Sequence, residues 1–206
     1  MKKAIFHRFC GNAWMLNQRH GKNRNLPPLI MLTDAGRLPD VEHIVPHLPY
    51  ASIIILRDYL HPERLAYGKK LAAVCRRYGH IFLVSNDPVL ATRLKADGLH
   101  IPESGHLNLG RGYRPSWLVT TAAHSRTGVL KAVKKGADAV LCSPVFPTQS
   151  HPEGKILGRL LFSKMVQGVN IPVYALGGVN AENIKQLKYS NVVGVAAIDA
   201  FASLHF

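Results

Sequence analysis

The chain has 206 residues, of which 47% are hydrophobic and 18% are charged, and its 26 Lys and Arg against 12 Asp and Glu give a formal net charge of +14. This composition fits one globular domain and excludes a disordered chain, and no segment approaches the roughly 20 apolar residues of a membrane span. The positive charge favours anionic partners such as phosphate esters or nucleic acid, but aromatic side chains do not interleave with it, so we favour a solvated basic surface and expect neither nucleic acid nor membrane as a partner.

Residues 1–27 form a basic extension without any Asp or Glu. Because His7 and Arg8 interrupt its only apolar run, we reject a secretory signal, while the composition leaves a transit peptide as an alternative. The three cysteines of the chain show no Cys-x-x-Cys spacing. We therefore expect reduced, buried thiols in a cytoplasmic protein rather than a disulfide or a metal site.

From Pro28 onward, short apolar runs alternate with segments of helical period. A run such as Ala51–Leu56, which is rich in β-branched residues and lacks polar alternation, is typical of a parallel strand buried on both faces. The same pattern recurs along the chain. The expected strands are 29–33, 51–56, 81–84, 98–101, 117–121, 139–142, 173–176 and 192–197.

The clearest helical segment lies between the second and third expected strands. We expect Pro62 at its first position and Gly79 at its end, as is typical of these residue types. Its apolar face is formed by Tyr67, Leu71, Val74, Cys75 and Tyr78. Spacings of three and four residues between these side chains indicate one buried stripe on a helix.

Shorter helices are expected after later strands. One covers residues 89–95, a second is capped by Ser125 and ended by Gly136, and a third is capped by Asn180. The apolar faces are Val129, Leu130 and Val133 in the second and Ile184 and Leu187 in the third. Only nine residues follow Ala197, too few for a full eighth helix.

Eight strands, each followed by a crossover segment, predict a parallel sheet that closes into a single (β/α)8 TIM barrel over residues 28–206. The alternative is an open, doubly wound sheet, which the lack of a Gly-x-Gly-x-x-Gly motif after the first strand disfavours. Residues 1–27 would then supply a helix that covers the bottom or the side of the barrel. The oligomeric state stays open.

In such a barrel the active site lies at the carboxyl ends of the strands. This rule selects residues by their position alone. They are Asp34, Arg57, Asp58, Asn86, Asp87, His100, Glu103, His124, Thr148 through His151, Gly177, Gly178 and Ala197 through Asp199.

Gly177 and Gly178, directly after the seventh strand, are the most informative pair. Glycine lets backbone N–H groups approach a ligand, and the loops after strands seven and eight of such barrels often bind phosphate. We therefore predict phosphate binding by Gly177, Gly178, Ala197 and Ile198. A plain tight turn is the alternative.

The polar loop after the sixth strand carries Thr148, Ser150 and His151, which are suited to hydrogen-bonding an anionic group. The alternative is a passive surface loop. Asn86 and Asp87 offer the oxygen ligands that Mg²⁺ prefers, but Asp87 is equally placed to cap the following helix.

The remaining candidates carry a charge or a proton at a strand end. Arg57 suits a phosphate or a carboxylate, and its competing use is a salt bridge to Asp58 or to another acid of the barrel. His100 and His124 are candidate bases, with a structural role as the alternative.

Together these segments resemble the thiamine-phosphate synthase family and its sister group, the TenI-type thiazole tautomerases, from about Leu29 to Phe201. The resemblance is carried by order and spacing. The matching motifs are Ser85-Asn86-Asp87, Ala96-Asp97-Gly98-Leu99-His100, Gly136-Ala137-Asp138, Ser143-Pro144-Val145-Phe146-Pro147-Thr148, Ile171 through Val179, and Asn183.

The resemblance implies a synthase that joins hydroxymethylpyrimidine diphosphate to thiazole phosphate and releases pyrophosphate, with Mg²⁺ on the diphosphate and Asp87 as a metal ligand. It also implies catalytic or substrate contacts for Arg57, Asn86, Thr148, Ser150 and His151. Ile55 and Tyr59 replace a glutamine and a lysine that contact substrate in the family.

Further departures concern charge and metal. The family's second metal-binding aspartate falls near Ser104-Gly105, Pro88 replaces an arginine, and Asp199 replaces a serine beside the phosphate loop. If the carboxylate of Asp199 faced the ligand, it would repel phosphate. In the tautomerases the catalytic histidine aligns with Pro144, so His124 or His151 would have to replace it.

Three functions therefore stay open from the sequence. The first is a divergent thiamine-phosphate synthase, a transferase. The second is a tautomerase-like isomerase acting on a phosphorylated azole. The third is a non-catalytic binder or regulator that keeps only the phosphate site.

Overall fold

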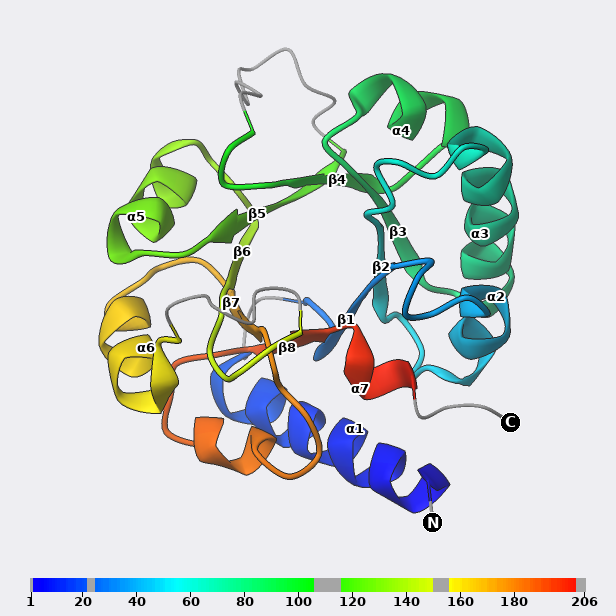
Figure 1. Ribbon diagram of the computed structural model, residues 1–206. Helices are drawn as coiled ribbons and strands as arrows, with labels where there is room; N and C mark the ends of the chain where they lie inside the picture. Colours follow the sequence, from blue (N-terminus) through cyan, green and yellow to red (C-terminus); the bar gives the residue numbers. More distant parts are fainter. Residues whose placement is uncertain (1, 22–24, 106–115, 150–155, 203–206) are drawn as a thin grey trace.

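The eight expected strands form one closed parallel barrel, shown along its axis in Figure 1. The computed structural model describes residues 2–21, 25–105, 116–149 and 156–202. The strands are β1 Leu29–Leu32, β2 Ile53–Leu56, β3 Ile81–Ser85, β4 Gly98–Ile101, β5 Leu118–Ala123, β6 Ala139–Cys142, β7 Val173–Leu176 and β8 Gly194–Ala197. Each pairs with the next, and β8 pairs with β1 to close the ring.

The strands are short, with four to six residues each. Every residue of β1, β2, β4, β6 and β8 is buried, as expected of strands covered on both faces. The pairing of β1 with β8 places Ile30 beside Ala196, and the pairing of β1 with β2 places Ile30 beside Ile53. The predicted TIM barrel is confirmed.

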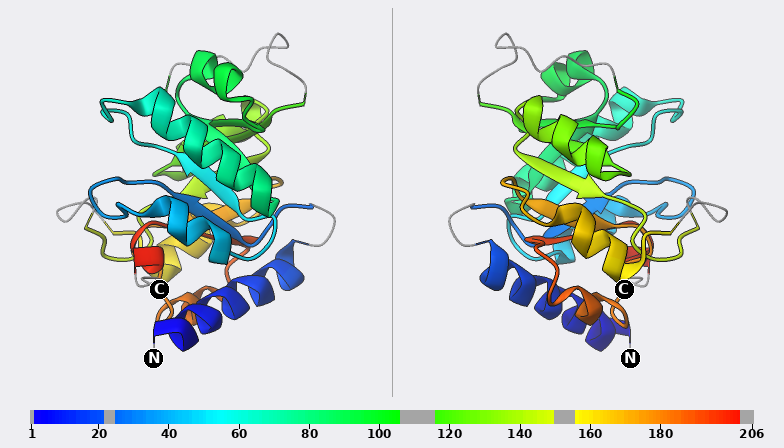
Figure 2. Two further views of the ribbon diagram at one scale, coloured as in Figure 1. Left: turned by 90° about the vertical axis from the view of Figure 1, so that its right-hand side faces the viewer. Right: turned by 90° about the vertical axis from the view of Figure 1, so that its left-hand side faces the viewer.

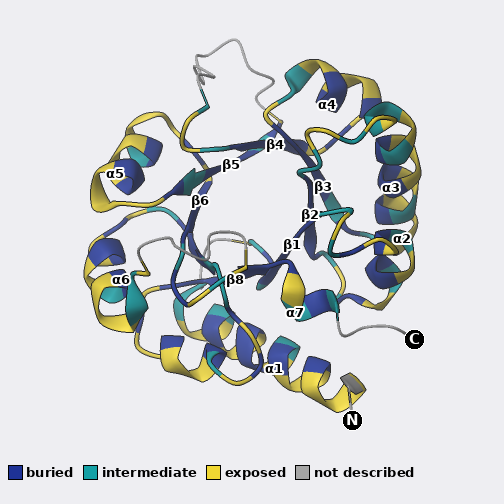
Figure 3. Ribbon diagram, in the orientation of Figure 1, coloured by how far each residue is buried: buried dark blue, intermediate teal, exposed yellow. Residues whose placement is uncertain are grey.

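Helices surround the barrel and lie outside the strands in Figures 1 and 2. They are α1 Lys2–His20, α2 Val41–Ile44, η1 Val45–His47, α3 Arg64–Tyr78, α4 Pro88–Leu94, α5 Arg126–Lys134, α6 Gly158–Val166, η2 Ile184–Leu187 and α7 Asp199–Ala202. Their buried faces turn toward the strands in Figure 3. No described helix is long and apolar enough to cross a membrane.

Several predicted helix ends are confirmed by their capping geometry. Gly79 has a left-handed φ of 71° and ends α3, and the hydroxyl of Ser125 accepts a hydrogen bond from Gly128 N at 3.0 Å. Other expectations are wrong. Helix α3 begins at Arg64, two residues after Pro62. Tyr78 of α3 is 40% exposed and Leu130 of α5 is 51% exposed, so neither faces the barrel as expected.

The helix predicted within the basic extension is α1, and it packs beside β8 and η2. Its buried face includes Phe6 and Phe9, which pack edge-on against Phe201. The ring centroids of Phe6 and Phe9 lie 6.2 and 6.1 Å from that of Phe201. The amide of Asn17 donates to the carbonyls of Leu26 and Val193, both at 2.9 Å. Since α7 has only four residues, α1 covers the part of the barrel where an eighth helix would lie (Figure 1).

The three thiols are free and partly or fully buried. Burial raises the pKa of Cys10, Cys75 and Cys142 to about 12, so each stays protonated at neutral pH. These cysteines are therefore packing residues in the barrel and in α1.

Candidate functional site

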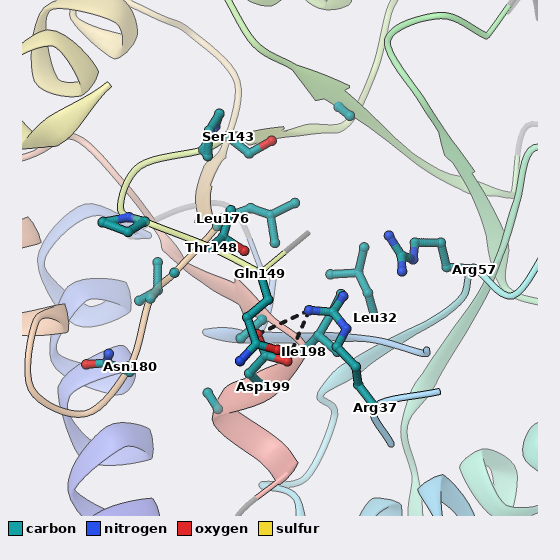
Figure 4. A pocket seen from close by; sticks show the side chains of 18 of the residues that line it. Leu32, Arg37, Arg57, Ser143, Thr148, Gln149, Leu176, Asn180, Ile198 and Asp199 are labelled. Carbon is teal, nitrogen blue, oxygen red and sulfur yellow. Dashed lines mark hydrogen bonds and ion pairs between the residues drawn. The ribbon is translucent and has the colours of Figure 1, made fainter. Parts of the chain in front are cut away.

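A cavity of about 430 Å³ opens at the carboxyl ends of the strands, where Figure 4 shows it from close by. Seven of the predicted site residues line it, and several lining residues were not selected from the sequence. The predicted ones are Arg57, His124, Thr148, Gly177, Gly178, Ala197 and Ile198; those not selected include Arg37, Tyr59, Ser143 and Asn180. His100 and Asp199, selected by position alone, also line it.

Gly177 and Gly178 bring the β7 loop close to the loop that follows β6. Their φ values are 89° and 66°, in the left-handed region that favours glycine. A Cβ on Gly178 would lie 2.1 Å from the carbonyl oxygen of Pro147, and one on Gly177 would lie 2.8 Å from the Cα of Pro144. Both glycines are therefore required for the two loops to pack at the cavity wall.

Two arginines and an aspartate form a charged wall on the β1–β2 side. The Oδ2 atom of Asp34 accepts from Arg57 Nη2 at 2.5 Å and from Arg37 Nε at 3.0 Å. Burial raises the pKa of Asp34, but the hydrogen bond and the charge of Arg37 together with the charge of Arg57 outweigh burial and lower the pKa overall. Arg57 thus pairs with another acid of the barrel rather than with Asp58.

Asp58 is engaged elsewhere. Its carboxylate accepts hydrogen bonds from the hydroxyl of Thr33 and from Ala35 N, the latter at 2.6 Å. It therefore fixes the turn after β1 and does not compete for the arginines.

Asp199 lines the cavity, and its carboxylate is turned toward Arg37 (Figure 4). Both of its oxygens lie 3.1 Å from Arg37 Nη1. Arg37 therefore bridges Asp34 and Asp199, and its charge offsets the carboxylate that replaces the family's serine. Asp34, Arg37, Arg57 and Asp199 form what we call the arginine–aspartate network.

His100 lies at the floor of the cavity and is 4% exposed. Its Nδ1 atom is hydrogen-bonded with Thr120 Oγ1 at 2.9 Å. Burial, together with the nearby charge of Arg57, lowers its pKa to about 4. At neutral pH His100 is therefore an uncharged polar residue of the wall and not a cationic ligand for phosphate.

His124, at the end of β5, has a defined tautomer in its neutral form. Its Nδ1 atom lies 2.9 Å from the carbonyl oxygen of Ser143, which accepts only, so Nδ1 carries the proton. The Nε2 atom then holds the lone pair and is 3.9 Å from Glu103 Oε2. Since His124 lines the cavity, this arrangement suits a general base.

A separate set of side chains occupies the ends of β2 and β3, and we call it the Tyr59–Asp87 cluster: Tyr59, Arg64, Ser85 and Asp87. The Tyr59 and Ser85 hydroxyl oxygens lie 2.7 Å apart. Arg64 donates from Nη2 to the carbonyl of Ser85 at 2.9 Å and pairs through Nη1 with Asp87 at 3.3 Å. Tyr59 lines the cavity, whereas Arg64 and Asp87 lie outside its lining.

Asn86 and Asp87 were offered by the sequence as magnesium ligands or, for Asp87, as a helix cap. Asp87 Oδ1 accepts from Leu90 N at 2.9 Å and caps α4, which is the other possibility. Asn86 is exposed and has a left-handed φ of 55°. Over the described residues, no group of three or more His, Cys, Asp or Glu could hold a metal ion. Mg²⁺ is commonly bound by one or two carboxylates together with substrate phosphates, and the one carboxylate here, Asp87, is already bonded to Leu90 N and Arg64.

Two predicted residues, Ser150 and His151, lie outside the described residues, so their place relative to the cavity is not described. Thr148 and Gln149, at the start of the same loop, line the cavity. Sequence reasoning missed Arg37, which sits four residues beyond the end of the first expected strand. Its signal was the helical spacing of an aspartate and an arginine in Asp34-Ala35-Gly36-Arg37.

Comparisons with known proteins agree on one family. A family model described as thiamine monophosphate synthase matches residues 39–201. The thiamine-phosphate synthase of Pyrococcus furiosus is 32% identical over 86% of this chain and 87% of that protein, and the one of Pyrococcus horikoshii is 31% identical over 84% and 85%. The solved structure of thiamine phosphate pyrophosphorylase from Pyrococcus furiosus has a TM-score of 0.73 at 26% identity, over 86% of this chain and 88% of that one. The chain belongs to the thiamine monophosphate synthase family.

Proposed function

We propose that this protein is a thiamine-phosphate synthase of thiamine biosynthesis. It would couple hydroxymethylpyrimidine diphosphate to thiazole phosphate: the C–O bond to the diphosphate breaks, pyrophosphate leaves, and the thiazole nitrogen bonds to the pyrimidine methylene carbon. The observation that carries the proposal is the 430 Å³ cavity bordered by Gly177 and Gly178, in a chain of this family. The volume suits a small phosphorylated ligand.

Different residues of the cavity would bind the phosphate groups of the two substrates. Backbone groups of Gly177, Gly178, Ala197 and Ile198 would bind the phosphate of the thiazole, as loops seven and eight do in many barrels. Arg57, which lines the cavity and has a side chain 33% exposed, would meet the departing pyrophosphate.

The loop after β6 would complete the anion contacts. Thr148 lies at the cavity, and Ser150 and His151 follow it in sequence. We propose that these hydroxyl and imidazole groups hydrogen-bond the anionic groups of the substrates, because polar loops on a rigid barrel often carry binding residues. Small phosphorylated substrates are thus the partners we propose, in a cytoplasmic location.

The test is a reconstituted reaction with the purified full chain. Both substrates are supplied with Mg²⁺ as the counter-ion of the diphosphate in solution, and thiamine phosphate is detected by mass spectrometry. We expect product from the wild type and a large loss for Arg57→Ala, but not for Arg159→Ala, which removes an exposed arginine on α6. If thiazole phosphate binds by calorimetry yet no product forms, the synthase proposal fails.

A second candidate function rests on His124. Its protonated Nδ1 is fixed by the carbonyl of Ser143, the residue before Pro144, where the resemblance places the histidine of the tautomerases, so Nε2 is left as the basic atom. A tautomerase-like proton transfer on a phosphorylated azole would use this base. His124→Asn should abolish the isomerisation while leaving azole phosphate binding intact, as followed by proton exchange in NMR; unchanged exchange would contradict this role.

A further inference from the structure

The family resemblance implies a metal ion near Asp87, yet both oxygens of that carboxylate are already bonded within the protein, while the buried Nε atom of the neighbouring Arg64 has no hydrogen-bond partner among the described residues. Asp87 Oδ1 is bound to Leu90 N at 2.9 Å, and Asp87 Oδ2 is paired with Arg64 Nη1 at 3.3 Å. Both oxygens therefore have a partner within the protein, and the positive charge beside them belongs to the chain itself.

Arg64 is held in place on several sides. Its side chain is only 16% exposed, Nη2 donates to the carbonyl of Ser85 at 2.9 Å, and the guanidinium lies 5.5 Å from the centre of the Tyr59 ring. A planar guanidinium with two anchored nitrogens and an aromatic face beneath it is a pre-organised cation. Its approach to Asp87 is thus fixed by the fold.

Among the described residues of the facing turn, the oxygen nearest to this place from a side chain is the uncharged amide of Asn86, whose Oδ1 would lie 3.2 Å from a Cβ on Gly105. Ser104, at the position of the family's second aspartate, is exposed and brings no charge. A side chain on the neighbouring Gly105 would lie 2.8 Å from Ile101 Cγ2 and 2.9 Å from the carbonyl of Pro102, so this turn admits no larger residue without a shift. One carboxylate already paired with arginine is a poor site for Mg²⁺.

We propose that Arg64 is the resident cation of the Tyr59–Asp87 cluster, holding the Asp87 carboxylate where the family resemblance implies a metal ion, and that the protein works without a metal ion of its own. The first part stands on the geometry alone. The second part rests on the proposed function. Anionic charge on a substrate is then met by the arginines that line the cavity, Arg37 and Arg57.

The probe is Mn²⁺ in the absence of substrate. Its binding to the protein is measured from the electron paramagnetic resonance signal of the ion that stays free. Wild type is compared with Asp87→Asn, which removes the charge but still caps a helix. We expect the two proteins to leave the same free Mn²⁺ signal up to millimolar concentrations. Mn²⁺ binding by wild type that Asp87→Asn abolishes overturns the proposal.

A thermal double-mutant cycle tests the ion pair itself. Arg64→Gln and Asp87→Asn should each lower Tm, and the double variant should lower it by less than the sum of the two. Arg64→Met, which also removes the charge, replaces Arg64→Gln if the latter does not fold. Arg159→Ala, which removes a cation from an exposed position, is the matched charge control and should change Tm little. Additive losses overturn the proposal.

Assaying the same preparations for thiamine phosphate separates this proposal from the proposed function. Product without Asp87-dependent Mn²⁺ binding supports both. Product with such binding keeps the synthase and overturns the role of Arg64. No product and no such binding overturns the synthase and keeps Arg64 as the resident cation, and no product with such binding overturns both.

Discussion

The two sides of the barrel mouth differ in how their polar groups are used. On the β6–β8 side, the glycine pair, His124 and the start of the β6 loop border a cavity. On the β2–β3 side, the Tyr59–Asp87 cluster satisfies its own charges and hydroxyls, and Arg64 and Asp87 stay outside that cavity.

This difference coincides with the departures from the family pattern. Tyr59 and Pro88, which replace a family lysine and arginine, belong to or adjoin the cluster. The Gly177-Gly178 loop keeps the pattern and borders the open cavity. The comparison teaches that one barrel mouth can present polar groups to an open cavity on one side and pair its charged groups with one another on the other side.

The largest expected effect is on the open side. Gly178→Ala forces a side chain into a left-handed φ and against the carbonyl of Pro147, so we expect a loss of unfolding free energy above about 3 kcal/mol and of turnover above about 100-fold. Denaturation and product assays measure both.

Gly136→Ala is the matched control for that change. Its φ of 75° is also left-handed, but nothing lies within 4 Å of an added Cβ, so only about 1 kcal/mol of strain is expected. Equal effects of the two substitutions would break the contrast between the packed Gly178 turn and an ordinary helix end.

The next prediction concerns His100, between the two sides. A histidine whose pKa is lowered from 6.5 to about 4 stays neutral when folded but takes up a proton when unfolded, so its stabilisation is present above pH 6.5 and lost as pH falls toward 4. The difference corresponds to roughly 3 kcal/mol at about 1.4 kcal/mol per pKa unit.

His100→Asn should remove this part of the pH dependence. The unfolding free energies of wild type and variant, measured by urea titration, should converge by roughly 3 kcal/mol between pH 6.5 and pH 4. If the unfolding free energies of the two proteins instead change in parallel with pH, burial in the folded protein does not lower the pKa of His100.

A smaller effect is expected in the arginine–aspartate network. Arg37→Ala leaves the carboxylate of Asp199 without its cation at the cavity, so thiazole phosphate should bind about tenfold more weakly, or about 1.4 kcal/mol. Calorimetry measures the affinity. Adding Asp199→Ser to Arg37→Ala should recover most of the loss, and no recovery would mean that Arg37 acts on the ligand directly.

The smallest effect is expected on the closed side. Asp87→Ala removes the cap of α4 and should cost about 1 kcal/mol, whereas Asp87→Asn retains the cap and should cost less. Thermal melts and product assays compare the two. Turnover abolished by Asp87→Asn in a folded protein would contradict the contrast between the two sides.

The barrel was predictable because buried parallel strands are continuous apolar runs, and β4, β6 and β7 were predicted to the residue. Strand β2 was predicted two residues too long at its start. Ala51 has a positive φ of 62°, and this backbone turn leaves no signal in an apolar run. The exposure of Leu130 likewise depends on how α5 is rotated about its axis. Three apolar residues at helical spacing are too few to determine that rotation.

The site was predictable only where position along a strand decides it. Gly177, Gly178 and His124 follow strand ends, so their place at the mouth was foreseeable from sequence. Arg37 and Asp199 are 162 residues apart and meet only because β8 closes on β1. The pairing of Arg64 with Asp87 likewise depends on the rotamer of an arginine on α3.

The position of α1 has a consequence for how this chain is assembled. The helix that covers β8 is made first, while the strand that it covers is made last, with β8 beginning at Gly194. During synthesis the rings of Phe6 and Phe9 cannot pack against Phe201 until that residue has been added to the chain. The helix that covers the last strand thus precedes the first strand, and moving α1 behind α7 by circular permutation would restore the uniform order of strand followed by helix.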